Sequence, residues 1–179
     1  MSFMHYISAN KELPLGVRGK KKPKQIGMSL EELKKTKACM PIETLIEKGI
    51  LIPEKVKVYD SLDDLGIIKI DNIKDVNEVV KKHFKNKFVY KFYGSFHLSE
   101  KLKNHSLEYY NRHKKCLEEL FKYIKENISD GEEFEIYTCW ADDEGEERNK
   151  KLDKVIDLKK FIIPESFDFV EREYIVIKG

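Results

Sequence analysis

Residues 104–141, "NHSLEYYNRHKKCLEELFKYIKENISDGEEFEIYTCWA", decide the fold of this chain. From residue 104 to 128 apolar side chains recur every three or four positions, which predicts a long amphipathic helix. "SDG" then supplies a turn, and residues 133–141 alternate in the manner of a half-buried strand. The strand residues expected on one face are Phe134, Ile136, Thr138 and Trp140. A long helix is thus expected to pack on a sheet.

The same criteria place further elements on both sides of this stretch. The predicted strands are residues 2–8, 56–60, 67–71, 87–94 and 167–178, and the predicted shorter helices are residues 29–37, 41–49 and 73–84. Ser29 with Glu32 forms a capping box, and Pro41 and Gly49 bound the next helix. If the strands on either side of the long helix are parallel neighbours, their crossover is right-handed, and the last strand can return antiparallel.

These elements predict an α+β fold in a single domain, residues 1–179. The chain of 179 residues is long enough for one hydrophobic core and short for two. We expect a mixed sheet of about five strands, with one long and several short helices packed mainly on one face.

The composition excludes a strong overall electrostatic field. Lys and Arg total 34 against 32 Asp and Glu, so the formal net charge is +2 and does not itself indicate a polyanionic partner. Three cysteines, Cys39, Cys116 and Cys139, are too few and too far apart for a disulfide framework. No leader and no membrane-length apolar segment stands out. We therefore expect a soluble cytoplasmic protein without a membrane partner.

Residues 9–27 form a long loop without a predicted element, because Pro and Gly interrupt it repeatedly. Its second part, "GVRGKKKPKQIG" (residues 16–27), is a basic loop. The cations of this loop, which are the candidate binding residues, are Arg18, Lys20, Lys21, Lys22 and Lys24. The glycine spacing excludes a Walker A phosphate loop. Contact with phosphates and exposure to water both remain compatible with the pattern.

An acidic run, "DDEGEE" (residues 142–147), directly follows the strand at 133–141. Its spacing does not match an EF-hand, so we expect no metal there. As an enzyme, the chain would use carboxylates at this strand end: Asp142 or Glu144 as acid or base, with Tyr137 or Trp140 lining a pocket. The alternative is a solvated acidic turn.

The other reactive residue types form no local motif. The histidines, among them His97 and His5, have no sequence neighbours that indicate a site. No Ser-His-Asp order, dinucleotide fingerprint or paired-cysteine zinc pattern is present, so we expect no cofactor. Residues that meet only in the fold leave no such local trace.

The sequence leaves the function unknown and favours a small binding or interaction module. Its two charged loops suggest an acidic protein surface, or self-association, as the partner of the basic loop. The first alternative is nucleic-acid binding through residues 16–27, and the second is the carboxylate enzyme.

Overall fold

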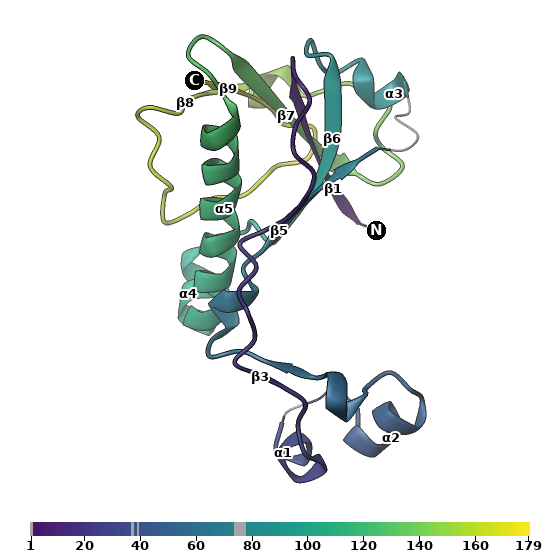
Figure 1. Ribbon diagram of the computed structural model, residues 1–179. Helices are drawn as coiled ribbons and strands as arrows, with labels where there is room; N and C mark the ends of the chain where they lie inside the picture. The colour runs from purple at the N-terminus through teal and green to yellow at the C-terminus, as the bar shows by residue number, and fades with distance from the viewer. Residues whose placement is uncertain (1, 37, 39, 74–77) are drawn as a thin grey trace.

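The computed structural model describes residues 2–36, 38, 40–73 and 78–179, which form a mixed α+β structure (Figure 1). Its centre is a seven-stranded sheet with the order β2-β5-β6-β1-β7-β9-β8. The strands of this sheet are β1 (Phe3–Ala9), β2 (Gly16–Arg18), β5 (Ile68–Asn72), β6 (Phe88–Tyr93), β7 (Glu133–Trp140), β8 (Lys154–Asp157) and β9 (Tyr174–Lys178). A separate ribbon pairs β3 (Gln25–Ile26) with β4 (Lys57–Val58).

The described helices differ greatly in length. They are α1 (Leu30–Lys34), α2 (Ile42–Glu47), α3 (Glu78–Lys81), α4 (Glu100–His105) and α5 (Leu107–Asn127). Short 3-10 turns lie at Pro53–Lys55, Leu62–Leu65 and Lys150–Leu152. No helix in the described ranges is both long enough and apolar enough to cross a membrane.

The prediction of about five strands was wrong, because the central sheet has seven. The additional strands β2 and β8 lie at the two edges and are three and four residues long. Proteins commonly keep edge strands short, and so short a run shows little alternation in a sequence. β2 and β3 also interrupt the long loop expected over residues 9–27.

Strand directions follow the expected pattern only in part. β9 returns antiparallel to β7, as predicted. β6 and β7 flank the long helix in sequence but are not neighbours, because β1 lies between them. Since β1 is antiparallel to both, β6 and β7 run in the same direction, and α5 belongs to the crossover that connects them.

α5 covers one face of the sheet and supplies the main core. Its residues Leu117, Leu120 and Ile124 are fully buried. The alternation predicted for β7 is confirmed, because Phe134 and Ile136 lie in this core. Burying each such side chain stabilises the fold by on the order of 2 kcal/mol, because its apolar surface is removed from water. This layer is therefore the chief source of stability.

The long predicted helix begins later than expected. Ser106 has extended backbone angles, φ −157° and ψ 108°, which separate α4 from α5. Its hydroxyl accepts a hydrogen bond from the backbone N–H of Tyr109 and so caps α5. Because Ser caps helices well and is a weak helix former, the periodic pattern alone did not reveal this break.

The opposite side of the sheet, here called the second face, has a smaller apolar cluster. Tyr6, Tyr137 and Cys139 point to this side and pack with Val80 of α3 and with Val89. The helix predicted over residues 73–84 is described only from Glu78, and residues 74–77 lie outside the described residues.

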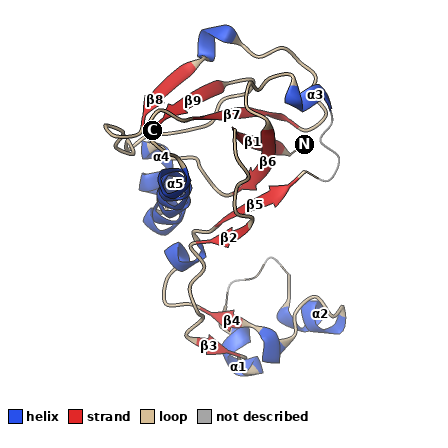
Figure 2. Ribbon diagram, turned by 45° about the horizontal axis from the view of Figure 1, so that its top comes forward, coloured by secondary structure: helices blue, strands red, loops and turns tan. Residues whose placement is uncertain are grey.

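Residues 19–67, between β2 and β5, form an arm that stands away from the sheet body in both ribbon views (Figure 1, Figure 2). The arm contains the β3–β4 ribbon, α1 and α2. Leu33 and Ile42 are its buried apolar side chains among the described residues. Other apolar side chains of the arm, such as Ile26 and Ile50, are exposed, at 64% and 67%. The arm therefore has little core of its own.

The predicted starts of the two arm helices are confirmed. Ser29 and Glu32 make both hydrogen bonds of the capping box, and Pro41 directly precedes the first residue of α2. Both helices end earlier than predicted, at Lys34 and Glu47. Lys34 Nζ lies 3.0 Å from Glu43 Oε1, an ion pair that links α1 to α2.

Two glycines allow the base of the arm to approach α5. A Cβ at Gly66 would lie 2.9 Å from the carbonyl oxygen of Arg112 and 2.6 Å from Lys115 Cβ. Gly19, with φ +76°, would place a Cβ 2.9 Å from the carbonyl oxygen of Gly66. Because backbone atoms cannot move aside as a flexible side chain can, both positions need glycine.

Candidate functional site

Two lysines of the basic loop already have carboxylate partners within the arm. Lys21 Nζ is hydrogen-bonded to the Asp64 carboxylate, and Lys24 Nζ lies 2.9 Å from Asp60 Oδ1. The hydrogen bond from Lys21 holds the pKa of Asp64 below its usual range. An external anion would have to compete with these two carboxylates.

The remaining cations of the basic loop do not converge on one point. The Arg18 guanidinium lies over the ring of Tyr123, 5.7 Å from its centroid, and its Nε is buried without a hydrogen-bond partner. Lys20 and Lys22 are exposed and make no ion pair with a described residue. The loop is thus partly neutralised, partly packed and partly in water.

The acidic loop, residues 142–147, folds back onto the second face of the sheet. The hydroxyl of Tyr6 donates to Glu144 Oε1 at 3.0 Å, and burial raises the pKa of Tyr6. His83 Nε2 donates to the carbonyl oxygen of Glu144 at 2.9 Å. Burial lowers the pKa of His83, so its ring is expected to be neutral at pH 7.

Residues after α3 hold this loop from the other side. Lys82 Nζ donates to the carbonyl oxygen of Gly145. The His83 ring stacks on Tyr137, with centroids 4.0 Å apart, and the Tyr137 hydroxyl donates to the carbonyl oxygen of Glu146 at 3.3 Å. The loop is therefore fastened through its own backbone, and no described hydrogen bond or ion pair joins it to the basic loop.

The structure brings together only part of the expected carboxylate site: Glu144 lies on the second face with Tyr137, whereas Asp142 and Trp140 lie elsewhere. Asp142 is exposed and has φ +77° in a turn. Trp140 packs edge-on against Phe3, with centroids 5.0 Å apart, on the α5 side of β7, whereas Tyr137 lies on the second face. Tyr137 and Trp140 thus do not share one cavity. The carboxylate-enzyme hypothesis stays a prediction.

A cavity of about 420 Å³, here called the basic pocket, opens where the chain after α3 meets the chain after the acidic loop. Its lining consists of Lys82, His83, Phe84, Lys85, Glu147, Arg148 and Lys150. Four of these side chains are cations and one is a carboxylate, while His83 is neutral. The basic pocket thus gathers cations from two segments that are distant in the sequence, whereas the cations of the basic loop are neighbours in the sequence.

Arg148 is held in a defined orientation on one wall of the basic pocket. Its guanidinium lies over the ring of Tyr174, 4.1 Å from the centroid, and its Nη2 is 3.3 Å from Asp153 Oδ2. The Tyr174 hydroxyl in turn donates to the carboxylate of Glu135. Stacking and pairing together restrict the guanidinium before any ligand arrives.

Glu135 links the two chain segments that form the basic pocket. Its carboxylate is 2% exposed and accepts from Ser8 Oγ at 2.9 Å and from the backbone N–H groups of Lys85 and Asn86, each at 3.0 Å, besides Tyr174. A buried carboxylate is stable when its oxygens are hydrogen-bonded in this way. Glu135 therefore fixes the segment after α3 relative to Tyr174, on which Arg148 stacks.

Sequence reasoning missed both Glu135 and the basic pocket. The alternation of β7 correctly placed Glu135 opposite Phe134 and Ile136, but it assigned no role to the residue. The available signal was a charged side chain in the middle of a strand whose other residues are mostly apolar. The pocket left no signal, because its lining residues meet only in the fold.

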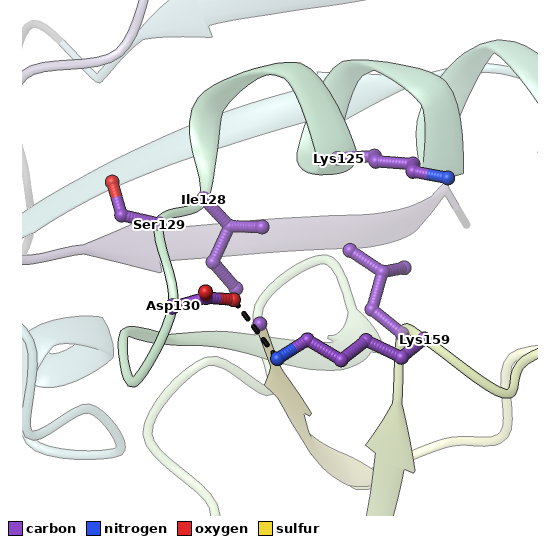
Figure 3. A pocket seen from close by; sticks show the side chains of 7 residues that line it. Lys125, Ile128, Ser129, Asp130 and Lys159 are labelled. Atoms are coloured by element: carbon purple, nitrogen blue, oxygen red, sulfur yellow. Dashed lines mark ion pairs between the residues drawn. The ribbon is translucent and has the colours of Figure 1, made fainter.

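A second cavity, of about 350 Å³, lies at the C-terminal end of α5 (Figure 3). Ile128 and Leu158 contribute apolar surface to it. Lys159 Nζ lies 2.9 Å from Asp130 Oδ1, and this contact lowers the pKa of Asp130. With Lys159 paired, Lys125 is the further cation of this lining, so the cavity offers fewer cations to an anion than the basic pocket does.

Metal and thiol chemistry find little support in the described part of the chain. Within it, no group of three or more His, Cys, Asp or Glu side chains is placed to hold a metal ion. Cys116 and Cys139 are buried and unpaired. Burial raises the pKa of the Cys139 thiol to about 12, which keeps it protonated at pH 7.

Comparisons of the chain with protein-family models, with curated proteins and with solved structures find no match.

Proposed function

We propose that this chain is a binding module whose basic pocket receives a phosphate-bearing group. The observation that carries the proposal is the lining of the pocket, where Lys82, Lys85, Arg148 and Lys150 surround one cavity and Glu147 is the only carboxylate. Guanidinium and ammonium groups are the side chains that bind phosphate oxygens in proteins. The lining holds four cations and one carboxylate, and Asp153 beside it pairs with Arg148, so these groups together carry a net charge of +2 at pH 7.

The shape of the site favours a compact anion. An acidic protein surface, the first partner expected from the sequence, spreads its carboxylates over a face, whereas the basic pocket is a concave space of about 420 Å³. A phosphate group presents three oxygens within a small volume and can contact several cations at once. Arg148, already restricted by Tyr174, loses less freedom on binding than a solvated lysine does.

A second candidate function is nucleic-acid binding through the basic loop. It is favoured by Lys20 and Lys22, which are exposed and lack ion pairs with described residues. The pairing of Lys21 with Asp64 and of Lys24 with Asp60 weighs against it. Fewer free cations mean fewer released counterions and a shallower dependence of binding on salt.

Two matched double variants distinguish the two sites. Arg148→Ala with Lys150→Ala removes two positive charges from the basic pocket, and Lys20→Ala with Lys22→Ala removes two from the basic loop. Binding of inorganic pyrophosphate is measured by calorimetry, and binding of a fluorescent single-stranded oligonucleotide by polarisation. The pocket variant is expected to weaken pyrophosphate binding about tenfold or more, as loss of a charged hydrogen bond implies, and the loop variant less than about twofold.

Other results would favour the second candidate function or reject the basic pocket as the binding site. If only the loop variant loses oligonucleotide binding while pyrophosphate binds neither variant nor the unaltered protein, the second candidate replaces the first. If both variants bind pyrophosphate as the unaltered protein does, the basic pocket is not the binding site. A further variant, Arg148→Lys, keeps the charge but removes the planar fork, and it should fall between the unaltered protein and the double variant.

A further inference from the structure

Three side chains away from the basic pocket form a continuous hydrogen-bonded chain. His97 Nε2 lies 3.0 Å from Ser99 Oγ, and His97 Nδ1 lies 2.7 Å from Asp168 Oδ2. A hydroxyl, an imidazole and a carboxylate thus contact each other in the order nucleophile, base and orienting group. His97 and Asp168 have side chains that are 50% and 56% exposed, so a dissolved substrate can reach them.

The fold brings these residues together through one antiparallel bridge. Leu98 N–H donates to the carbonyl oxygen of Phe167 at 2.7 Å, and Phe167 N–H donates back at 3.0 Å. In this register His97 lies opposite Asp168. His113 of α5 also donates through Nδ1 to the carbonyl oxygen of His97 at 2.8 Å, which holds the backbone of His97 in place.

The hydrogen bonds assign the protons along this chain. An ionised Asp168 only accepts, so the hydrogen of the neutral His97 ring lies on Nδ1 and Nε2 is free to accept. Ser99 Oγ accepts from the backbone N–H of Leu102 at 3.1 Å. The hydroxyl hydrogen of Ser99 is therefore directed at His97 Nε2, the atom that would have to take it.

A small cavity lies along α4. It measures about 260 Å³ and is lined by Glu100, Lys103, Asn104, Glu165 and Ser166. Glu100 is the residue next to Ser99. Lys103 lies four residues after Ser99 and is the cation of this lining, and its Nζ is 3.5 Å from Glu165 Oε1.

We propose that Ser99, His97 and Asp168 form an ester-hydrolysing triad that acts on small carboxylic esters, independently of the basic pocket. Ser99 Oγ bonds to the ester carbonyl carbon while its proton passes to His97 Nε2. The tetrahedral intermediate then breaks the bond to the alkoxy oxygen, and the alcohol leaves with the proton from His97. Water attacks the acyl-serine with the same base, which releases the carboxylic acid and restores Ser99.

A purely structural role for the same residues would be a helix cap beside a surface ion pair. Ser99 caps α4 through Leu102 N–H, and Ser106 caps α5 through Tyr109 N–H in the same manner. Among the described contacts, Ser106 has no histidine partner. Ser106 is therefore a control for Ser99 within the same molecule.

The test is the rate at which each serine reacts with a fluorophosphonate probe, mapped by peptide mass spectrometry on the full chain. An adduct is expected on Ser99 and not on Ser106. Because a positioned general base accelerates such reactions about 100-fold or more, His97→Ala should slow labelling of Ser99 by at least about that factor, and Asp168→Asn should also slow it. Ser99→Asp keeps a good cap while removing the hydroxyl, so it should fold normally and resist labelling.

Three results would overturn the triad: no adduct on Ser99, equal labelling of Ser99 and Ser106, or a His97→Ala variant that reacts as fast as the unaltered protein. Hydrolysis of p-nitrophenyl acetate provides a second readout. The Ser99→Asp variant is expected to lose most of the activity above buffer, and an unchanged rate would also overturn the proposal.

Discussion

The sheet body and the arm hold their charged groups in opposite ways. In the body, the Glu135 carboxylate is 2% exposed and is bonded by fixed neighbours. In the arm, the lysine side chains that pair with Asp64 and Asp60 are 59% and 68% exposed. The densest basic run of the sequence thus lies where water and nearby carboxylates moderate its charge, whereas the body gathers scattered cations around a cavity. Charge density along the chain is therefore a poor guide to charge density in the fold.

The largest expected difference between the two regions is in apolar packing. Leu117→Ala in α5 removes a fully buried side chain from the main core and should lower the free energy of unfolding by about 4 kcal/mol. Leu33→Ala in the arm, also at a buried position (2% exposed), should leave most of the body intact. Urea unfolding measures the first effect, and native-state hydrogen exchange should locate the second in the arm amides. Equal loss of body stability in both variants would show that the arm and body unfold as one unit.

A smaller difference in the free energy of unfolding is expected between a buried and an exposed glutamate of the body. Glu135→Ala leaves the hydrogen-bond donors of Ser8, Lys85, Asn86 and Tyr174 without their acceptor, and it should cost about 3 kcal/mol. Glu133→Ala, two residues earlier on the same strand, removes an exposed partner of Lys178 at 3.2 Å and should cost less than about 1 kcal/mol. Urea unfolding of both variants makes the comparison. Similar values for the two would mean that the Glu135 network contributes little.

The smallest effect concerns acid sensitivity within the body. Burial of the His5 ring among Phe92, Phe96 and Phe169 lowers its pKa from 6.5 to about 4, while Asp168 acts in the opposite direction. The unfolded chain therefore binds this proton first, and stability falls as the pH drops below about 6.5. Between pH 7.5 and 5.5 the unaltered protein should lose about 1 kcal/mol more than a His5→Phe variant.

Thermal or urea unfolding at the two pH values measures this difference, with His5→Phe as its own reference because phenylalanine suits the same aromatic surroundings. Parallel pH profiles for the two proteins would show that His5 does not carry the acid sensitivity.

Local patterns predicted the parts of the fold that local physics determines. The stripe of α5, the alternation of β7 and the capping box at Ser29 each depend on residues a few positions apart, and each is confirmed. The edge strands β2 and β8 escaped prediction because three or four residues carry almost no periodicity. Their existence depends on a neighbouring strand that offers hydrogen bonds.

The candidate sites depend on contacts that span the chain. His97 has only Ser99 as a nearby partner in sequence, and Asp168 reaches it through the Leu98–Phe167 bridge. Arg148 is linked to the segment after α3 through Tyr174 and Glu135, which lie far from both in the sequence. A motif search along the sequence therefore detects neither site.

The register of β2 and β5 at the base of the arm has a practical consequence. Arg18 lies opposite Ile68 in the antiparallel pair of β2 and β5, so the chain leaves the sheet and re-enters it at the same point. The two strands form a hairpin whose connection is the whole arm. A tight turn between Arg18 and Ile68 would close this hairpin and keep the strand pairing of the seven-stranded sheet. A chain lacking residues 19–67 would lose the packing of Gly66 against Arg112 and Lys115 of α5, so its stability would show how much the base of the arm contributes to the body.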